Sequence, residues 1–349
     1  MQVINARNVH DALPRALRLL DQEGIQRDSR NGPVIVIPEP VTVVYERPCE
    51  RVLFWPQRDA NPFFHLAEAL WMLAGRNDVE VPARYAKHIA SFSDDGETLH
   101  GAYGHRWRYH FGIDQLSYIA AQLKKDPNNR RCVLSMWDAR TDLVRPDGKD
   151  LPCNTIATLQ RNVDGALDLT MFQRSGDVIW GVMGANAVHM SLMQEYVALM
   201  IGCPVGFYHQ VVSNFHAYVE VFNKLDSIRP DYANYDNPYA DGLVSSTPLF
   251  HGSILAADKR IDQLLYDADH GLYRKPTLDE PFFNNAWALL AAHQAWRVET
   301  GDNRYLVPLD ILSQWPQHND WIAAATQWIQ RRYERWKQRF VLAGDENQK

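Results

Sequence analysis

Apolar residues recur at helical spacing, or in long apolar runs, in six stretches of the chain. Side chains three or four positions apart share one face of a helix, so each stretch predicts a helix with a buried face. Residues 61–75 also carry terminal signals, because Asn61 suits the N-cap, Pro62 the first helical position and Gly75 the end. The six predicted helices are residues 10–23, 61–75, 113–129, 186–202, 282–301 and 319–340.

Strand-like runs fill much of the sequence between the first helices. They are residues 34–46, 130–137, 155–163 and 166–174. The pair Asp164 and Gly165 predicts a tight turn between the last two runs, and therefore an antiparallel hairpin. This mixture of helices and strands indicates an α+β fold. We expect one main domain over 1–275 and a helical C-terminal extension over 276–349.

Composition narrows the classes of function. The 349 residues can bury a large core, and the net charge of −6 argues against binding a nucleic acid polymer, which needs a basic surface. A small anion held by a few arginines is still allowed. The four cysteines lie far apart, and no apolar run predicts a signal peptide or a membrane span. We therefore expect a cytoplasmic protein without membrane contact.

Several familiar motifs are missing from the sequence. It contains no phosphate loop, no HExxH, no GxSxG and no glycine-rich dinucleotide fingerprint. The thirteen histidines show no metal-ligand spacing, so we expect no metal.

Cys153 lies behind a proline at the start of a predicted strand, in KDLPCNT. Most cysteines are buried structural thiols, and that interpretation stays open for this one. A neighbouring arginine would favour the thiolate and make Cys153 a nucleophile. Arginines do stand at strand ends here, in Arg130–Arg131 and in Gln173–Arg174–Ser175, where guanidinium groups match phosphate oxygens. For any one of them alone, an ordinary surface arginine is the better interpretation.

Glu68 shares the apolar face of its predicted helix with Phe64 and Trp71. Burial there would raise the pKa of its carboxyl group and suit it to acid or base catalysis. The alternative is a glutamate at the edge of the apolar stripe, paired with an arginine. Asn186 begins a later helix, and its structural alternative is the role of N-cap.

In their order along the chain, several stretches resemble the thymidylate synthase family, including its pyrimidine-nucleotide hydroxymethylase branch. They are AEALWMLAG, GAYGHRW, DPNNRRCVLSMW, LPCN, QRSGD and SNFHAYVE, with RDSRNG as a weaker match. The resemblance runs from about Arg30 to Tyr218. It implies the family's mixed sheet flanked by helices, to which this chain adds a helical C-terminal segment.

The resemblance also assigns roles to residues. The implied catalytic residues are Cys153, Glu68 and Tyr103. The implied nucleotide-binding residues are Arg30, Arg130, Arg131, Arg174, Ser175, Asn186, His216 and Tyr218. The implied folate contacts are Asp177 and Trp180. In the family, the arginines that match Arg130 and Arg131 cross a homodimer interface to the partner's phosphate site.

The chemistry of the family fits these residues. The Cys153 thiolate would add to C6 of a pyrimidine ring, and C5 would then take a one-carbon unit from 5,10-methylenetetrahydrofolate. Glu68, Tyr103 and ordered water would move the protons, which leaves an exocyclic methylene group on the ring. In the synthases a hydride from the folate completes a methyl group, whereas the hydroxymethylases add water.

Three departures from the synthase pattern favour the addition of water. The chain ends in polar GDENQK instead of an apolar tail, and HIASF offers Ile89 and Phe92 where synthases carry tryptophan. Asn154 follows the nucleophile, where synthases usually have histidine. A less sealed site admits water to the intermediate.

Asn186 is expected to recognise the base. Uracil readers in the family use asparagine at the start of this helix and cytosine readers use aspartate, because an amide donates and accepts whereas a carboxylate only accepts. GVMGANAVH has one residue more than the synthase pattern, and the downstream matches place Asn186 at the position and displace Ala185. Ser175 and Arg131 also fit the members that use deoxynucleotides.

We therefore expect a deoxyuridylate hydroxymethylase, of the sort that bacteriophages use to make modified DNA precursors. Thymidylate synthase is the second hypothesis, and a deoxycytidylate hydroxymethylase is the third. A folate- or nucleotide-binding protein without turnover is the alternative from another class. The presence of Cys153, Glu68 and Arg174 speaks against it.

Overall fold

The computed structural model describes residues 1–225, 228, 235–249, 254–273 and 280–346, with side chains as far as residue 338. The expected boundary between 1–275 and 276–349 lies within 274–279, outside the described residues. The elements up to residue 142 are β1 (Gln2–Ala6), α1 (Val9–Glu23), β2 (Ile25–Arg27), β3 (Val34–Val36), β4 (Val41–Tyr45), α2 (Pro62–Leu73), α3 (Glu80–Tyr85), the 3-10 helix η1 (Lys87–Phe92), α4 (Tyr103–His105), the π-helical turn η2 (Arg106–His110), α5 (Gln115–Lys125), β5 (Val133–Ser135) and α6 (Ala139–Asp142). The later elements are β6 (Asn154–Arg161), β7 (Leu167–Gln173), β8 (Gly176–Asp177), the π-helical segment η3 (Val178–Ala185), α7 (Asn186–Ile201), β9 (Val205–Val212), β10 (Phe215–Tyr218), α8 (Val219–Asn223), α9 (Ile254–His270), α10 (Pro281–Val298), α11 (Asn303–Ser313) and α12 (Asp320–Glu346).

A six-stranded mixed sheet, in the order β1-β4-β9-β7-β6-β5, forms the base of the fold. β1 is parallel to β4 and β7 is parallel to β9, while the other neighbours are antiparallel. A second sheet has the order β2-β3-β10-β8. In this sheet His216 of β10 pairs with Asp177 of β8, which brings together two stretches that the sequence analysis assigned to one site.

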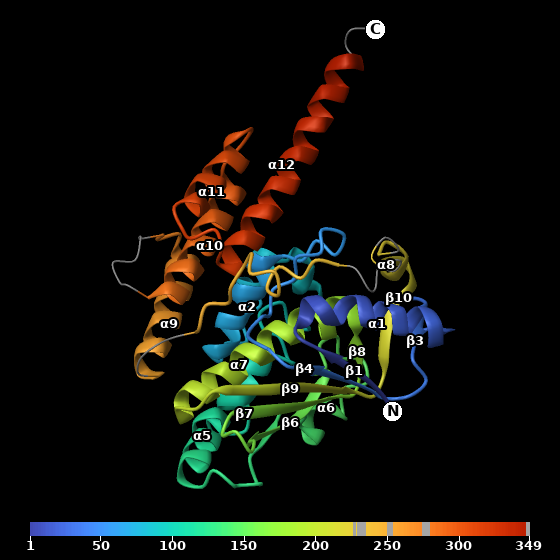
Figure 1. The fold of residues 1–349 in the computed structure, drawn as a ribbon, viewed down its shortest axis with the longest axis vertical. Coiled ribbons are helices and arrows are strands. Elements are labelled where there is room, and N and C mark those ends of the chain that lie inside the picture. The colour runs from blue at the N-terminus through green and yellow to red at the C-terminus, as the bar shows by residue number, and fades with distance from the viewer. Residues whose placement is uncertain (226–227, 229–234, 250–253, 274–279, 347–349) are drawn as a thin grey trace.

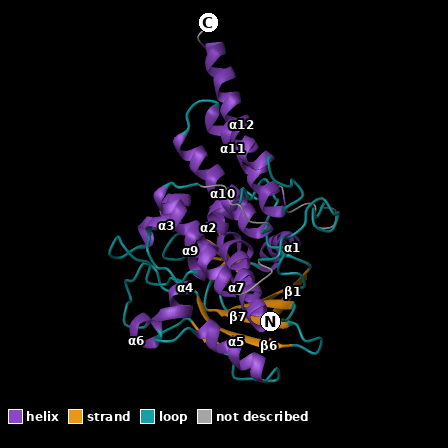
Figure 2. Ribbon diagram, turned by 90° about the vertical axis from the view of Figure 1, so that its left-hand side faces the viewer, coloured by secondary structure: helices purple, strands orange, loops and turns teal. Residues whose placement is uncertain are grey.

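Helices cover one face of the large sheet. Figure 1 shows α1, α2 and α7 on the same side of β4, β9 and β7. Helices α10, α11 and α12 lie beyond α2, and the view at right angles in Figure 2 shows the same order. Helix α7 is buried along most of its length, because it lies between the sheet and α2.

The six predicted helices are all present, with ends that differ by a few residues. Local signals explain the agreement. The Asn61 side chain accepts a hydrogen bond from the Phe64 N–H and caps α2, and Gly75 follows the helix with φ of 72°. Across the described residues, no helix is both long enough and apolar enough to cross a membrane.

The predicted strands are partly corrected. Residues 155–163 and 166–174 form the expected hairpin of β6 and β7, with Gly165 at φ of 78° in the turn. Residues 34–46 form two strands in different sheets, because Pro38 and Pro40 cannot donate to a ladder and separate β3 from β4. Residues 130–137 yield only the short edge strand β5.

Candidate active site

The hairpin of β6 and β7 places Cys153 beside Arg174. Asn154 and Gln173 pair across the two strands, so the residues next to them meet at the end of the hairpin. Arg174 donates from Nε to the Pro152 carbonyl at 2.9 Å, and its Nη2 lies 3.8 Å from the Cys153 Sγ. Arg174 is therefore the neighbouring arginine that the nucleophile interpretation of Cys153 requires.

Burial of the Cys153 thiol opposes the effect of that arginine. Burial raises the pKa of the Cys153 thiol above its ordinary value, and the charges of Asp150 and Asp177 act in the same direction. Arg174 lowers the pKa but does not outweigh burial. The arginine thus acts in the predicted direction, but burial leaves the pKa of the Cys153 thiol above its ordinary value. The sequence analysis considered the charge of the arginine but did not account for the desolvation of the buried thiol.

Tyr103 supports the nucleophile from the other side. Its hydroxyl oxygen accepts hydrogen bonds from the backbone N–H groups of Cys153 at 3.0 Å and of Asn154 at 3.1 Å. Burial raises the pKa of the Tyr103 phenol, which stays protonated. Because the oxygen accepts from the backbone, the phenolic proton is left to donate elsewhere in the site.

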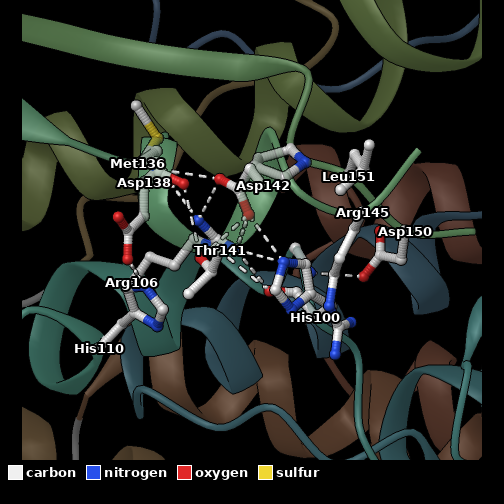
Figure 3. A network of polar contacts seen from close by, with 12 residues as sticks. His100, Arg106, His110, Met136, Asp138, Thr141, Asp142, Arg145, Asp150 and Leu151 are labelled. Atoms are coloured by element: carbon white, nitrogen blue, oxygen red, sulfur yellow. Dashed lines mark hydrogen bonds and ion pairs between the residues drawn. The ribbon is translucent and has the colours of Figure 1, made fainter. Parts of the chain in front are cut away.

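A buried polar network ties the segment of Tyr103 to the segment that leads to Cys153 (Figure 3). Arg106 donates to both carboxylate oxygens of Asp142, at 2.9 and 2.8 Å, and to the Met136 carbonyl at 2.6 Å. His100 Nε2 lies 2.7 Å from Asp142 Oδ1. Asp150 accepts from the Gly101 N–H at 2.8 Å. The network fixes the relative position of the two segments.

Glu68 lies on α2 in the surroundings that an acid or base catalyst needs. Burial, and secondarily the charge of Asp150, raises the pKa of its carboxyl group to about 8. Its Oε2 lies 3.3 Å from His189 Nε2, and burial lowers the pKa of His189 to about 3, so the ring is neutral. This contact with a neutral histidine is not a hydrogen bond, and no arginine forms an ion pair with Glu68 among the described residues. The described structure therefore gives no support to the arginine-paired alternative, and the catalytic role of Glu68 stays a prediction.

Asn186 is the first residue of α7 and does not cap it. The residue before it, Ala185, occupies the cap position, and the Asn186 Oδ1 accepts from Asn154 Nδ2 at 3.2 Å. Both amides are buried, and Asn154 Oδ1 has no hydrogen-bond partner within the described part of the chain. Met183 and Gly184 leave helical geometry just upstream, where the sequence analysis located one extra residue.

A cavity of about 810 Å³ opens beside Glu68, and it contains both predicted folate contacts. Trp180 is 51% exposed on its wall. Asp177 accepts from the Trp180 N–H at 2.6 Å, whereas its Oδ2 is buried with no hydrogen-bond partner among the residues described. Phe64, Ile89 and Phe92 supply apolar wall. A stacking ring, apolar walls and a free carboxylate oxygen suit a flat heteroaromatic ligand with N–H donors.

Arg58 also lines this cavity and was missed by the sequence analysis. It is buried, its Nε donates to the Ile179 carbonyl at 2.8 Å, and its guanidinium lies 4.2 Å from the centre of the Trp180 ring. Its only sequence signal is its position just before the capped helix α2. Asp150 was missed as well, although it stands three residues before the nucleophile.

The predicted sugar and phosphate residues are distributed unevenly. Tyr218 lines the cavity, and the ring centres of His216 and Tyr218 lie 5.7 Å apart on β10. Asn31 Nδ2 donates to the Tyr218 hydroxyl at 3.5 Å, so the loop that carries Arg30 lies close to β10. Ser175 directly precedes β8, next to Arg174.

Arg130 and Arg131 are not part of this group. They are exposed at the start of the edge strand β5 and do not line the cavity. One chain by itself therefore leaves them away from the residues that surround Cys153. Their predicted role across a dimer interface stays a prediction.

This fold, with a cysteine beside an arginine, a buried glutamate of raised pKa and an adjoining cavity, suits a transferase that acts on two substrates. A sequence model of thymidylate synthase matches residues 58–235. The chain belongs to the thymidylate synthase family, whose members act on a nucleotide with methylenetetrahydrofolate as co-substrate.

Relatives of known name agree with this assignment. The chain is 48% identical to the deoxyuridylate hydroxymethyltransferase of Pseudomonas phage M6 over 99% of both proteins. It is 36% identical to the enzyme of the same name from Bacillus phage SP01, over 52% of this chain and 50% of that protein. It is 33% identical to thymidylate synthase from Symbiobacterium thermophilum, over 47% of this chain and 60% of that one.

A solved structure confirms the predicted fold class. Thymidylate synthase from T4 phage superposes with a TM-score of 0.51 at 20% identity, over 65% of this chain and 85% of that one. The match supports a mixed sheet flanked by helices, and the helical C-terminal region follows it in this chain.

Proposed function

We propose that this chain transfers a one-carbon unit from 5,10-methylenetetrahydrofolate to C5 of dUMP and adds water, which yields 5-hydroxymethyl-dUMP and tetrahydrofolate. One observation carries the proposal: a relative named deoxyuridylate hydroxymethyltransferase matches 99% of this chain, including its C-terminal helices. The match to thymidylate synthase from Symbiobacterium thermophilum covers only 47% of the chain. Since such relatives come from bacteriophages, we also propose that the enzyme works in the cytoplasm of an infected host.

The amide pair of Asn154 and Asn186 supports uracil as the base. The Asn186 Oδ1 accepts from Asn154, so the described residues leave its Nδ2 donor free to face a ligand. A ring carbonyl such as O4 of uracil would accept from that donor, whereas the amino group of cytosine would not. Asn154 Oδ1 is buried without a partner and can accept a ligand N–H, such as N3–H of uracil, directly or through water.

The cavity beside Glu68 supports a folate as the second substrate. The unpartnered Asp177 Oδ2 can accept from N–H groups of a pterin ring, and Trp180 can cover its face. When bound there, the folate supplies the one-carbon unit.

Glu68 and Tyr103 then transfer different protons of the reaction. The Cys153 thiolate bonds to C6 while Glu68, which holds its proton near neutral pH, supplies a proton toward O4 through ordered water. After the one-carbon unit has bonded to C5, water held by the Tyr103 hydroxyl removes the C5 proton as the bond from that carbon to the folate nitrogen breaks. The C5 and O4 protons pass through water to the folate nitrogens, and tetrahydrofolate leaves. Water then adds to the exocyclic methylene carbon of the nucleotide and gives its proton to the Glu68 carboxylate. The ring double bond re-forms as Cys153 leaves as thiolate.

Product analysis tests this function. The chain is incubated with dUMP and methylenetetrahydrofolate, and the nucleotide is examined by mass spectrometry. We expect a gain of CH2O and no rise in dihydrofolate absorbance, and a Cys153→Ser variant should form no product. A gain of CH2 with stoichiometric dihydrofolate would instead identify a thymidylate synthase.

We propose further that the enzyme is a homodimer that joins through the open face of the large sheet. Ile156, Phe172 and Val211 lie side by side across β6, β7 and β9, and all three are partly exposed. Such an apolar stripe on a sheet face suits burial against a second copy.

Shared sites would follow from a dimer in which Arg130 and Arg131 reach the partner. Cys153→Ser and Arg131→Ala chains would each be inactive alone. Mixed and allowed to exchange subunits, they should regain part of the wild-type rate, because one site of the hybrid receives both functional residues. No recovery after verified exchange would contradict sharing.

A further inference from the structure

Three arginines of α12 converge on one carboxylate far away in the sequence. Arg332 Nη2 lies 3.0 Å from Asp59 Oδ2, Arg331 Nη2 lies 3.0 Å from Asp59 Oδ1, and Arg335 Nη2 lies 3.4 Å from Oδ2. Charge-assisted bonds from several forked donors hold a carboxylate more firmly than one exposed ion pair does. We call Asp59 and these three arginines the α12 clamp.

Asp59 also has a backbone conformation that needs support. Its φ of 44° makes it the only non-glycine residue with positive φ in the described part of the chain. Aspartate tolerates the left-handed region better than most residues, yet a glycine would adopt it more easily. Such a residue persists where its surroundings determine its position, and here the α12 clamp does so.

The clamped turn is part of the wall of the folate cavity. Asp59 lines that cavity, and so does its neighbour Arg58, whose guanidinium stacks on Trp180. On the outer side Asp59 and Arg331 line a smaller cavity of about 330 Å³. The turn therefore joins the C-terminal helices to the residues that would touch the second substrate.

Packing inside the molecule fixes α12 against the same region. Arg332 lies over the ring of Trp328, and Trp328 packs edge-on against Phe63 of α2 with 5.3 Å between ring centres. The cluster thus has a rigid base on the helix that carries Glu68.

We infer that Arg331 and Arg332 of the C-terminal extension are positioning residues, which hold the Asp59 turn so that Arg58 and Trp180 form the folate-binding wall. The inference rests on the proposed function. It assigns to the added helices a specific task in the binding of the second substrate. The nucleotide side, around Cys153 and Asn186, does not contact the α12 clamp in the described structure.

The main test compares two variants. The double variant Arg331→Ala/Arg332→Ala should raise the KM for methylenetetrahydrofolate by about tenfold, because a displaced wall loses binding contacts. The KM for dUMP should change by less than about twofold, since the nucleotide contacts are untouched. Lys337→Ala removes another exposed cation of α12, one that lies over Tyr333, and should leave both constants unchanged.

Substitutions of Asp59 distinguish the effect of its carboxylate from the effect of its left-handed backbone conformation. Asp59→Gly keeps the left-handed conformation but removes the carboxylate, so it should behave like the double variant. Asp59→Asn keeps the size of the side chain and should cause a smaller rise in the folate KM. Wild-type folate KM in Asp59→Gly, or equal rises for folate and dUMP in the double variant, would overturn the inference.

Two further measurements keep folding and function apart. Melting temperatures identify variants that fail to fold, in which case the comparison rests on Asp59→Asn and Arg335→Ala. Calorimetric binding of tetrahydrofolate to the chain saturated with dUMP needs no turnover. A wild-type chain without hydroxymethylated product would refute the proposed function, whereas unchanged tetrahydrofolate affinity in the double variant would refute the α12 clamp.

Discussion

Replacing Glu68 with glutamine tests whether the buried carboxyl group of Glu68 lowers the stability of the fold. The pKa of the Glu68 carboxyl group is raised from 4.5 to about 8, chiefly by burial and then by Asp150. Between these two pH values the folded protein keeps a proton that the unfolded chain has released. Stability must therefore fall as pH rises through this window.

The size of the effect follows from the two pKa values. They lie about 3.5 pH units apart, and each unit corresponds to about 1.4 kcal/mol. Ionised Glu68 therefore destabilises the fold by at most about 5 kcal/mol above pH 8, and by nothing below pH 4.5. Domains are commonly stable by only about 5–15 kcal/mol, so this cost is large.

Urea unfolding of wild type and Glu68→Gln, near pH 5 and near pH 9, measures the effect. Glutamine has no proton to lose, so the stability difference in favour of the variant should grow by several kcal/mol from the lower pH to the higher. Glu80→Gln is the matched control, because Glu80 has 79% of its side chain exposed. A difference for Glu68→Gln that stays constant with pH would refute the reasoning. The same variant should lose about 10²–10⁴ in kcat.

Three further changes have definite expected outcomes. Asn186→Asp should lower kcat/KM for dUMP and raise it for dCMP, and an unchanged ratio would mean that another residue reads the base. Alkylation of Cys153 by iodoacetamide, followed by mass spectrometry, should accelerate as pH rises past 9, because the thiol pKa lies above its ordinary value of 9.0. Arg174→Gln should slow alkylation at every pH below that pKa, and equal rates would contradict the role of the guanidinium. Asp142→Asn should cost about 3–5 kcal/mol in urea unfolding, because Arg106 is left buried without a full charge partner, and a loss below about 1 kcal/mol would contradict it.

The sequence predicted the elements whose cause is local. Helix α2 has its N-cap, its proline and its terminal glycine within fifteen residues, and the hairpin of β6 and β7 has its turn residues between the strands. Strands β1 and β9 were missed, because β1 pairs with β4 across a whole helix and β9 enters between β4 and β7. No pattern within a short window encodes such pairings.

The same distinction between local and distant causes applies to the residues of the candidate site. Cys153 and Glu68 lie in short motifs, so the sequence alone can name them as candidates. The clamp between Asp59 and α12 joins positions 272 or more residues apart, and nothing near either end indicates the other. The direction of the Cys153 pKa was missed because it depends on how deeply the thiol is buried, which sequence does not give.

The C-terminal helices also stabilise α2, the helix that carries Glu68, whose ionised carboxylate lowers the stability of the fold. Phe63, five residues before Glu68, has ring neighbours in both α10 and α12: His293 at 5.3 Å and Trp328 at 5.3 Å. Large aromatic rings buried in this way each contribute about 1.5–3 kcal/mol, which is of the order of the cost of Glu68. Helix α12 also holds Asp59, which lines the cavity. Stabilising α2 and shaping the cavity wall are thus two consequences of one interface. A variant that weakens the packing of Trp328 on Phe63 should lower stability and folate affinity together, whereas loss of the arginines alone should act mainly on folate.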